Sequence, residues 1–149
     1  MKKIAIIGSG PTGIYTFYSL LNNAAPLSIT VFEKADQPGV GMPYSDEDNS
    51  RLMLANIASI EIPPIFITYL DWLKQQSAAH LARYNVDSEK LHDRQFLPRI
   101  LLGEYFHDRF LAVVAEAKKS GFHVEVHPNA EVTDIKADAD GVALSVNDA

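Results

Sequence analysis

Three glycines fall within a six-residue stretch, Gly8-Ser-Gly-Pro-Thr-Gly13, which stands between two apolar segments near the start of the chain. The preceding residues 4–7 are all apolar, as in a strand that is covered on both faces. After the glycines, apolar residues recur with helical spacing along one face, at Ile14, Phe17, Tyr18 and Leu21. Residues 29–32 then read as a second strand, so the segment 2–33 is predicted to fold as a β-α-β unit.

The glycines of this turn have separate expected tasks. Gly8 allows the sharp turn out of the strand, Gly10 lets the backbone approach a pyrophosphate closely, and Gly13 lets the helix pack against the strand. Pro11 suits the first helical turn because its missing N–H has no intrahelical partner there. The N–H groups of that turn, which includes Thr12, and the positive end of the helix dipole would face the phosphates.

An acidic residue follows the second strand at the spacing that a ribose partner requires. Glu33 comes 20 residues after Gly13, where a carboxylate can accept hydrogen bonds from a ribose diol. It would repel a 2′-phosphate, so the predicted ligand is a dinucleotide other than NADP. A glycine-rich motif alone is a weak signal, but strand, helix and acid together favour dinucleotide binding. Two alternatives stay open: a tight turn that binds nothing, and a methyltransferase, which uses a similar glycine loop and acid.

Composition excludes several functional classes. A length of 149 residues favours one domain with a real core, and a net charge of −6 argues against a nucleic-acid or acidic-membrane surface. The chain has no cysteine, which excludes a disulfide scaffold and a thiolate metal site. Its apolar stretches are too short to span a membrane, and the glycines interrupt any resemblance to a signal peptide. The simplest interpretation is a cytoplasmic protein with no nucleic-acid or membrane partner.

The residues after the second strand form a loop by composition. Residues 34–50 are dense in Gly, Pro, Asp and Ser. Gly39 and Gly41 would let the backbone pass close to a ligand, although a solvated surface loop is an equal alternative. Further on, Asn56 and Ser59 are polar residues in apolar surroundings. They could meet a polar ligand edge, but a turn or capping role is favoured.

Two helices are predicted in the middle of the chain. Thr68, with Asp71 three residues later, forms a plausible capping box for a helix from Tyr69 to Lys74. Trp72 in this helix is expected to pack in the core or on a domain surface, with stacking on a cofactor as the less favoured alternative. The longest helix is predicted to start after Pro98. It carries a buried stripe of Leu102, Phe106, Phe110, Val113 and Ala117, and it stops at Lys118-Lys-Ser-Gly121.

Arg99 lies in the first turn of the longest helix, where the helix dipole disfavours a cation. That placement suggests an anionic partner, either a carboxylate or a cofactor phosphate, with a solvated surface arginine as an equal alternative. The following strand places His123, Glu125 and His127 on one polar face. An exposed edge face is favoured over a metal site there, because the other histidines are scattered. Residues 132–137 and 142–146 then flank a hairpin turn.

These residues also carry a resemblance. Ile-Ile-Gly-Ser-Gly-Pro-Thr-Gly with Glu33 is similar to the N-terminal FAD-binding signature of two-dinucleotide flavoproteins. Three further segments resemble a narrower group of bacterial FAD/NAD(P)-binding oxidoreductases that are akin to flavin monooxygenases: Gly39–Tyr44, Leu52–Ile57 and Leu97–Tyr105. The likeness extends over essentially the whole chain, although the first 33 residues are its diagnostic part.

The resemblance implies roles for individual residues. Gly8, Gly10, Pro11, Thr12 and Gly13 would form the pyrophosphate turn, and Glu33 with the adjacent Lys34 would lie at the adenosine ribose. By the same resemblance, Gly41, Met42 and Asn56 would lie on the flavin side of the cofactor. Arg99 would help to hold the cofactor, and the backbone of Val132 would contact the adenine. The implied function is the FAD-binding domain of a flavin-dependent oxidoreductase, with NAD(P)H as a candidate electron donor bound through a region outside this chain. No catalytic residue is singled out, and a non-catalytic nucleotide-binding module is a further alternative.

The predicted fold is a Rossmann-like three-layer α/β fold. It has a parallel sheet with strand order 3-2-1, a helical insertion and a β-hairpin. These flavoproteins continue with further parallel strands and a flavin-binding Gly-Asp motif, which this sequence lacks. The first strand would therefore keep an apolar edge unpaired, which favours aggregation. We expect residues 1–149 to be the front portion of a longer protein, or another chain, including a second copy, to cover that edge.

Overall fold

The structure is a computed structural model that describes residues 1–40, 54–55 and 57–148. The predicted Gly41, Met42 and Asn56 lie outside these residues. In chain order the elements are β1 (Lys3–Ile7), α1 (Pro11–Leu20), β2 (Ser28–Phe32), the short 3-10 helix η1 (Ser59–Glu61), α2 (Tyr69–Lys74), α3 (Ala78–Ala82), α4 (Arg99–Lys119), β3 (His123–His127), β4 (Val132–Asp138) and β5 (Gly141–Val146). Among the described helices, none combines the length and apolar content needed to cross a membrane.

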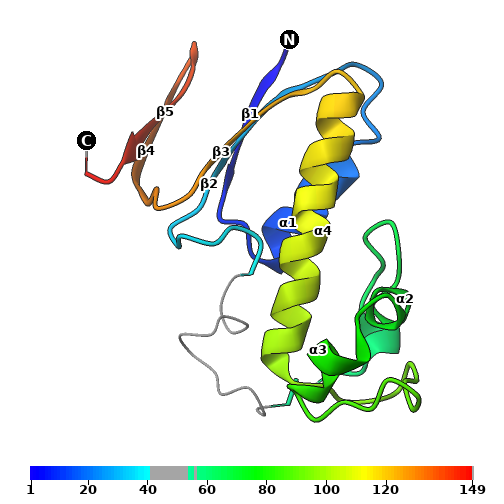
Figure 1. Cartoon of the computed structure of the whole chain (residues 1–149). Coiled ribbons are helices and arrows are strands. Elements are labelled where there is room, and N and C mark those ends of the chain that lie inside the picture. The colour runs from blue at the N-terminus through cyan, green and yellow to red at the C-terminus, as the bar shows by residue number, and fades with distance from the viewer. Residues whose placement is uncertain (41–53, 56, 149) are drawn as a thin grey trace.

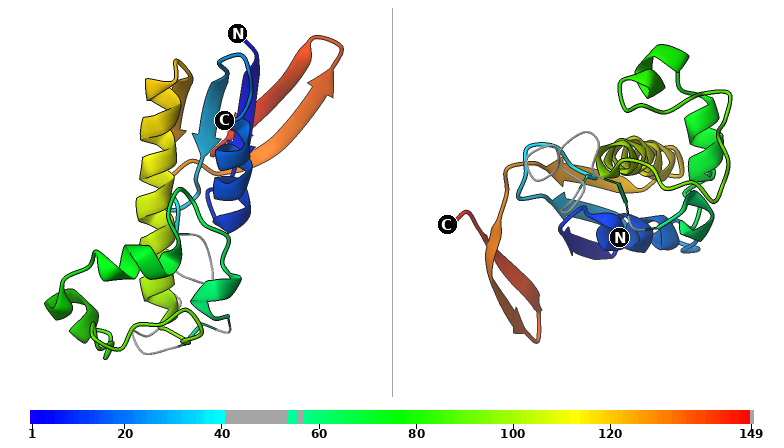
Figure 2. Two further views of the ribbon diagram at one scale, coloured as in Figure 1. Left: turned by 90° about the vertical axis from the view of Figure 1, so that its right-hand side faces the viewer. Right: turned by 90° about the horizontal axis from the view of Figure 1, so that it is seen from below.

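The central sheet has three parallel strands in the order β1-β2-β3, which confirms the predicted order. Helices α1 and α4 pack on each other and on one face of the sheet, as Figures 1 and 2 show. The strands β4 and β5 form a separate antiparallel hairpin beyond the other face. A groove of about 650 Å³ lies between the hairpin and the residues of β1 and β2. The three predicted layers are therefore present.

The interface between the helices and the sheet follows the predicted apolar stripes. Ile14 and Phe17 of α1 are fully buried, and Phe110 and Val113 of α4 are at most 1% exposed. The rings of Phe17 and Phe110 meet edge to face with centroids 6.3 Å apart, a favoured aromatic geometry. Burial of this stripe fixes α4 beside α1 over the sheet.

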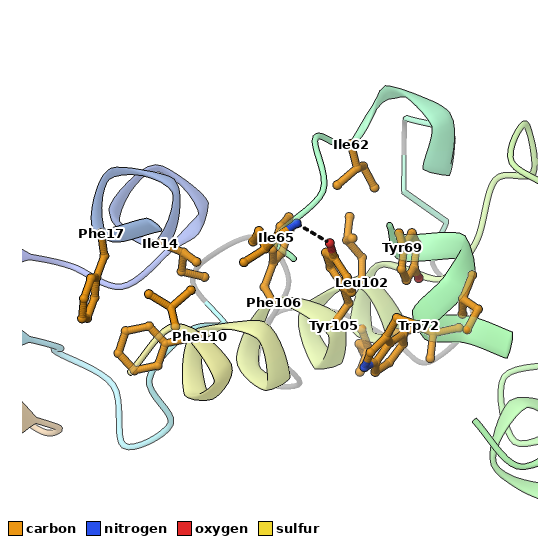
Figure 3. Close-up of a cluster of buried hydrophobic side chains, with 14 of the residues drawn as sticks. Ile14, Phe17, Ile62, Ile65, Tyr69, Trp72, Leu102, Tyr105, Phe106 and Phe110 are labelled. Carbon is orange, nitrogen blue, oxygen red and sulfur yellow. Dashed lines mark hydrogen bonds between the residues drawn. The ribbon is translucent and has the colours of Figure 1, made fainter. Parts of the chain in front are cut away.

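Helix α2 packs with an aromatic cluster on the other end of α4 (Figure 3). The Thr68 hydroxyl accepts a hydrogen bond from the Asp71 N–H at 3.0 Å, so the Thr68 half of the predicted capping box is confirmed. Trp72 is 4% exposed, as predicted for a core residue, and its indole N–H donates to Asp108 at 3.0 Å. Its ring packs edge to face on Tyr105, which also contacts Tyr69.

The two buried tyrosines of this cluster differ in their hydrogen bonds. The Tyr105 hydroxyl accepts from the Ile65 N–H at 3.2 Å (Figure 3). It also donates to the Ile67 carbonyl at 2.9 Å. The Tyr69 hydroxyl has no hydrogen-bond partner among the described residues. Burial raises the pKa of both tyrosines, Tyr69 most strongly. The Tyr105 hydroxyl therefore joins the insertion to α4, whereas the Tyr69 hydroxyl adds no such bond.

Tyr105→Phe is expected to lower the free energy of unfolding by about 1–3 kcal/mol, because it leaves the buried Ile65 N–H without an acceptor. Tyr69→Phe is the matched control. It removes a buried oxygen that makes no described bond, so stability should be unchanged or slightly higher. Urea unfolding of the two variants measures both effects. A Tyr69→Phe variant that loses as much stability as Tyr105→Phe would contradict this assignment.

Among the described strands, β1 and β3 are the two edge strands of the central sheet. The side chains of His123, Glu125 and His127 on β3 are between 49% and 62% exposed, which confirms the predicted exposed edge face. His127 also stacks on Phe32, with ring centroids 5.5 Å apart. On β1, Ile7 is 50% exposed. Pairing of the β1 edge with another strand or a second copy stays a prediction.

Candidate functional site

The glycine turn has the geometry that its spacing predicted. Gly8 has a φ of +91° and donates its N–H to the Phe32 carbonyl at 2.8 Å. A left-handed φ favours glycine, because other residues meet a steric penalty there. A Cβ added at Gly13 would lie 2.1 Å from the Gly8 carbonyl oxygen. The sharp turn at Gly8 and the close packing at Gly13 are therefore confirmed.

The N-terminus of α1 opens directly out of this turn. Gly10 is the N-cap residue, with φ −71° and ψ −175°, and Pro11 is at the start of the helix as predicted. The first N–H groups of a helix have no intrahelical partner, and Gly10 has no side chain that could accept from them. The N–H groups of Thr12 and Gly13 thus have the arrangement that suits an anion at a helix N-terminus.

Glu33 lies beside the turn, and its carboxylate is engaged by the protein. Its Oε1 accepts from the Ser9 N–H at 3.0 Å and from the Ser9 hydroxyl at 2.6 Å, and its Oε2 accepts from the Ala35 N–H at 2.8 Å. Glu33 is 7% exposed and Ser9 is 1% exposed. The structure therefore brings the predicted acid to the glycine turn through Ser9.

Ser9 is the residue of this site that sequence reasoning missed. Besides donating to Glu33, its hydroxyl accepts from the Gly39 N–H at 2.8 Å. It thus connects the glycine turn, the acid and the loop that follows β2. The only local signal for this role was the presence of a hydroxyl group in a turn whose other residues are expected to act through their backbone.

The loop 34–40 is held against α4. Gly39 is buried with a φ of +91°, and a Cβ there would lie 2.8 Å from the Phe110 Cβ and 3.0 Å from the His107 Cα. The His107 Nδ1 also bonds the Pro38 carbonyl oxygen. Glycine at position 39 is therefore required by the packing of the loop on helix α4, and the close approach of a ligand to this loop stays a prediction.

Two predicted residues border the Glu33 end of the site. The Ala130 N–H donates to the Glu33 carbonyl at 2.7 Å, which places the start of β4 and the half-buried Val132 near the acid. The exposed Lys34 ammonium lies 3.8 Å from the Glu131 carboxylate. Surface pairs of this kind contribute little to stability. Lys34 and Val132 thus lie close to the Glu33 end of the site.

Arg99 is further away, at the first residue of α4. Its Nε donates to the Leu54 carbonyl at 3.0 Å. It precedes His107 by eight residues, which corresponds to about 12 Å along the helix axis. A cleft of about 290 Å³ lies along this part of α4, lined by Gln37, Val40, Tyr84, Ile100, Gly103, Glu104 and His107. The structure therefore does not bring Arg99 to the glycine turn, and its described contact is to backbone.

The similarity to known proteins can now be set beside this geometry. Residues 5–149 match the FAD-NAD(P)-binding family. The chain belongs to this family. It is 63% identical over 147 residues to the uncharacterized protein YdhS of Escherichia coli K12, a match that covers 99% of this chain and 28% of YdhS. This FAD-NAD(P)-binding chain therefore spans less than a third of the length of that relative.

Two further matches are more distant. A probable mitochondrial NADPH:adrenodoxin oxidoreductase of Saccharomyces cerevisiae is 47% identical over 38 residues, which is 25% of this chain and 8% of the yeast protein. Among solved structures, the Diels-Alderase PyrE3 has a TM-score of 0.50 and 16% identity, over 99% of this chain and 30% of that chain. At this identity the PyrE3 match bears on the fold alone. It agrees with the Rossmann-like α/β architecture predicted for this FAD-NAD(P)-binding domain.

Proposed function

We propose that this chain is the FAD-binding domain of a flavin-dependent oxidoreductase. The glycine turn and the N-terminus of α1 hold the pyrophosphate, and Glu33 holds the adenosine ribose. One observation carries the proposal: the Glu33 carboxylate bonds both donors of Ser9, a residue of the glycine turn. Ser9 thus connects the turn that carries the proposed phosphate-binding N–H groups to the acid that is proposed to bind the ribose. The diphosphate and the adenosine ribose are also neighbours in FAD, so one ligand can reach both groups.

Different groups of the site would bind different parts of the cofactor. The N–H groups at the start of α1 and the helix dipole stabilise the diphosphate charge. Gly10, which lacks a side chain, lets the diphosphate come close to the backbone. Glu33 accepts from the ribose and disfavours a 2′-phosphate by charge repulsion. The low exposure of Ser9 and Glu33 limits competition from water for these bonds.

FAD is favoured over other dinucleotides by the resemblance of the glycine turn and Glu33 to the flavoprotein signature. A bound flavin would supply the redox chemistry, while the protein positions it. Lys34 and Val132 are proposed to border the adenosine, and Arg99 to reach the cofactor from α4. NAD(P)H is proposed as the electron donor, bound through a region outside this chain. A reduced pyridine nucleotide would then transfer its hydride to the flavin.

The Gly10→Ala variant tests the pyrophosphate site separately from the fold. A φ of −71° is accessible to any residue, so the variant should unfold within a few degrees of the parent. The added methyl would stand where the diphosphate meets the backbone, so FAD affinity should fall about tenfold or more. Titration of the purified protein with FAD, followed by flavin absorbance and fluorescence, measures this loss.

Gly121→Ala is the matched control for that experiment. Gly121 has a φ of +90° and lies beyond the end of α4. Alanine there should lower stability by about 1 kcal/mol and leave FAD affinity unchanged. Wild-type affinity for FAD in Gly10→Ala would refute the placement of the diphosphate. A parent protein that binds S-adenosylmethionine but not FAD would instead support the methyltransferase alternative.

A second pair of variants compares the two proposed side-chain contacts. Glu33→Ala is expected to weaken FAD binding much more than Arg99→Ala, because Glu33 adjoins the glycine turn and Arg99 does not. The same flavin titration measures both affinities, and a thermal scan records any loss of folding in Glu33→Ala. Equal losses of affinity in two folded variants would contradict the assignment of Glu33 to the ribose.

A further inference from the structure

The hydrogen bonds of Glu33 leave little room for a ligand. An ionised carboxylate offers about four acceptor positions, two on each oxygen. Two protein donors occupy Oε1, the N–H and the hydroxyl of Ser9, and one occupies Oε2, the N–H of Ala35. The described donors therefore leave one acceptor position on the carboxylate, and it is on Oε2.

The Ser9 hydroxyl fixes which position is left. It donates to Glu33 Oε1 at 2.6 Å, a short bond to a charged acceptor. It also accepts from the Gly39 N–H at 2.8 Å, and Gly39 is packed against α4. Rotation of the Glu33 carboxylate would break the bonds to Ser9. Rotation of the Ser9 side chain would leave the Gly39 N–H without its acceptor.

We infer that Ser9 is a positioning residue that restricts Glu33 to one of the two hydroxyls of the adenosine ribose. This inference rests on the proposed function, because it concerns the same nucleotide site. The bound ribose donates one hydroxyl to the remaining position on Oε2, while Oε1 stays bonded to Ser9. The site therefore distinguishes a nucleotide that lacks this hydroxyl from one that lacks the other.

Three small probes test the inference on the purified protein: ADP, 2′-deoxy-ADP and 3′-deoxy-ADP. Isothermal titration should show that one deoxy analogue binds about tenfold or more weakly than ADP, because it lacks a hydrogen bond to a charged acceptor. The other analogue should bind within about threefold of ADP. Equal losses for the two analogues would overturn the inference, because they would mean that Glu33 holds both hydroxyls.

The Ser9→Ala variant tests the positioning role. Without the Ser9 hydroxyl, Oε1 has a free acceptor position for the second ribose hydroxyl, so the weaker analogue should gain affinity and the ratio between the two analogues should fall below about threefold. A merely structural role of Ser9 would lower the affinity for all three probes by the same factor, and this result would overturn the inference. Thr16→Ala is the matched control. Its hydroxyl bonds the Thr12 carbonyl within α1 at 2.8 Å, so its loss should leave the ratio unchanged.

A measurement without ligand completes the test. Hydrogen exchange of the Gly39 amide should be faster in Ser9→Ala than in the parent and in Thr16→Ala, because its acceptor is gone. An unchanged exchange rate would overturn the link through Ser9. If Ser9→Ala does not fold, the analogue ratio of the parent protein still decides the question. A parent that binds FAD without any ribose discrimination refutes this inference alone, whereas a parent that binds neither FAD nor ADP refutes the proposed function as well.

Discussion

Alanine at position 13 is expected to lower the free energy of unfolding by roughly 3 kcal/mol or more, because the turn cannot accommodate a side chain there. The new Cβ would lie 2.1 Å from the Gly8 carbonyl oxygen, and no side-chain rotation can separate the two atoms because each is bonded directly to the backbone of the β1-α1 turn. The strain can be relieved only if α1 moves away from β1. Thermal or urea unfolding of Gly13→Ala, followed by circular dichroism, measures the loss.

Gly10→Ala, in the same turn, is the control for this effect. Its backbone conformation is compatible with alanine, so it should keep nearly the parental stability. The two variants should therefore differ in their free energy of unfolding. Gly13→Ala should lose stability, whereas Gly10→Ala should lose only FAD affinity. Parental stability in Gly13→Ala would show that the turn is looser than its geometry indicates.

Gly39→Ala is expected to be the second most damaging change. Two costs combine at this position: a φ of +91°, and a Cβ 2.8 Å from the Phe110 Cβ. Gly121→Ala isolates the first cost, because Gly121 has a φ of +90° and, among the described residues, its added Cβ meets only the Pro26 ring at 3.7 Å. We expect a loss of roughly 1 kcal/mol for Gly121→Ala and roughly 2–4 kcal/mol for Gly39→Ala.

Urea unfolding of the two variants gives the difference between these losses directly. That difference measures how tightly the loop 34–40 is packed on α4. Equal destabilisation of the two variants would mean that the contact with α4 is soft, and that a ligand is the better explanation for glycine at position 39.

Much of the fold was predictable because the decisive signals are local. The glycine turn, the cap at Thr68 and the start of α4 after Pro98 each depend on residues within a few positions of one another. Their structural outcomes match the predictions. The parallel strand order followed from the β-α-β unit together with the resemblance to flavoproteins. Local chemistry and chain topology were sufficient for these features.

The organisation of the site was less predictable because it depends on contacts that are distant in sequence. Ser9 meets Glu33 across 24 residues and Gly39 across 30. Gly39 requires glycine because α4, some 70 residues later, passes over it. The periodicity of the sequence says nothing about such pairs. Sequence reasoning therefore placed the acid at the turn but missed the hydroxyl that orients it.

Helix α4 has 21 residues, which gives a rod of about 31 Å. One half of the rod packs on α1 and the sheet through Phe110, while the other half carries the aromatic cluster around Tyr105 (Figures 1 and 3). Neither half can melt without removing the support of the other. The sheet and the helical insertion should therefore denature in a single cooperative transition, and a calorimetric scan should show one heat-absorption peak.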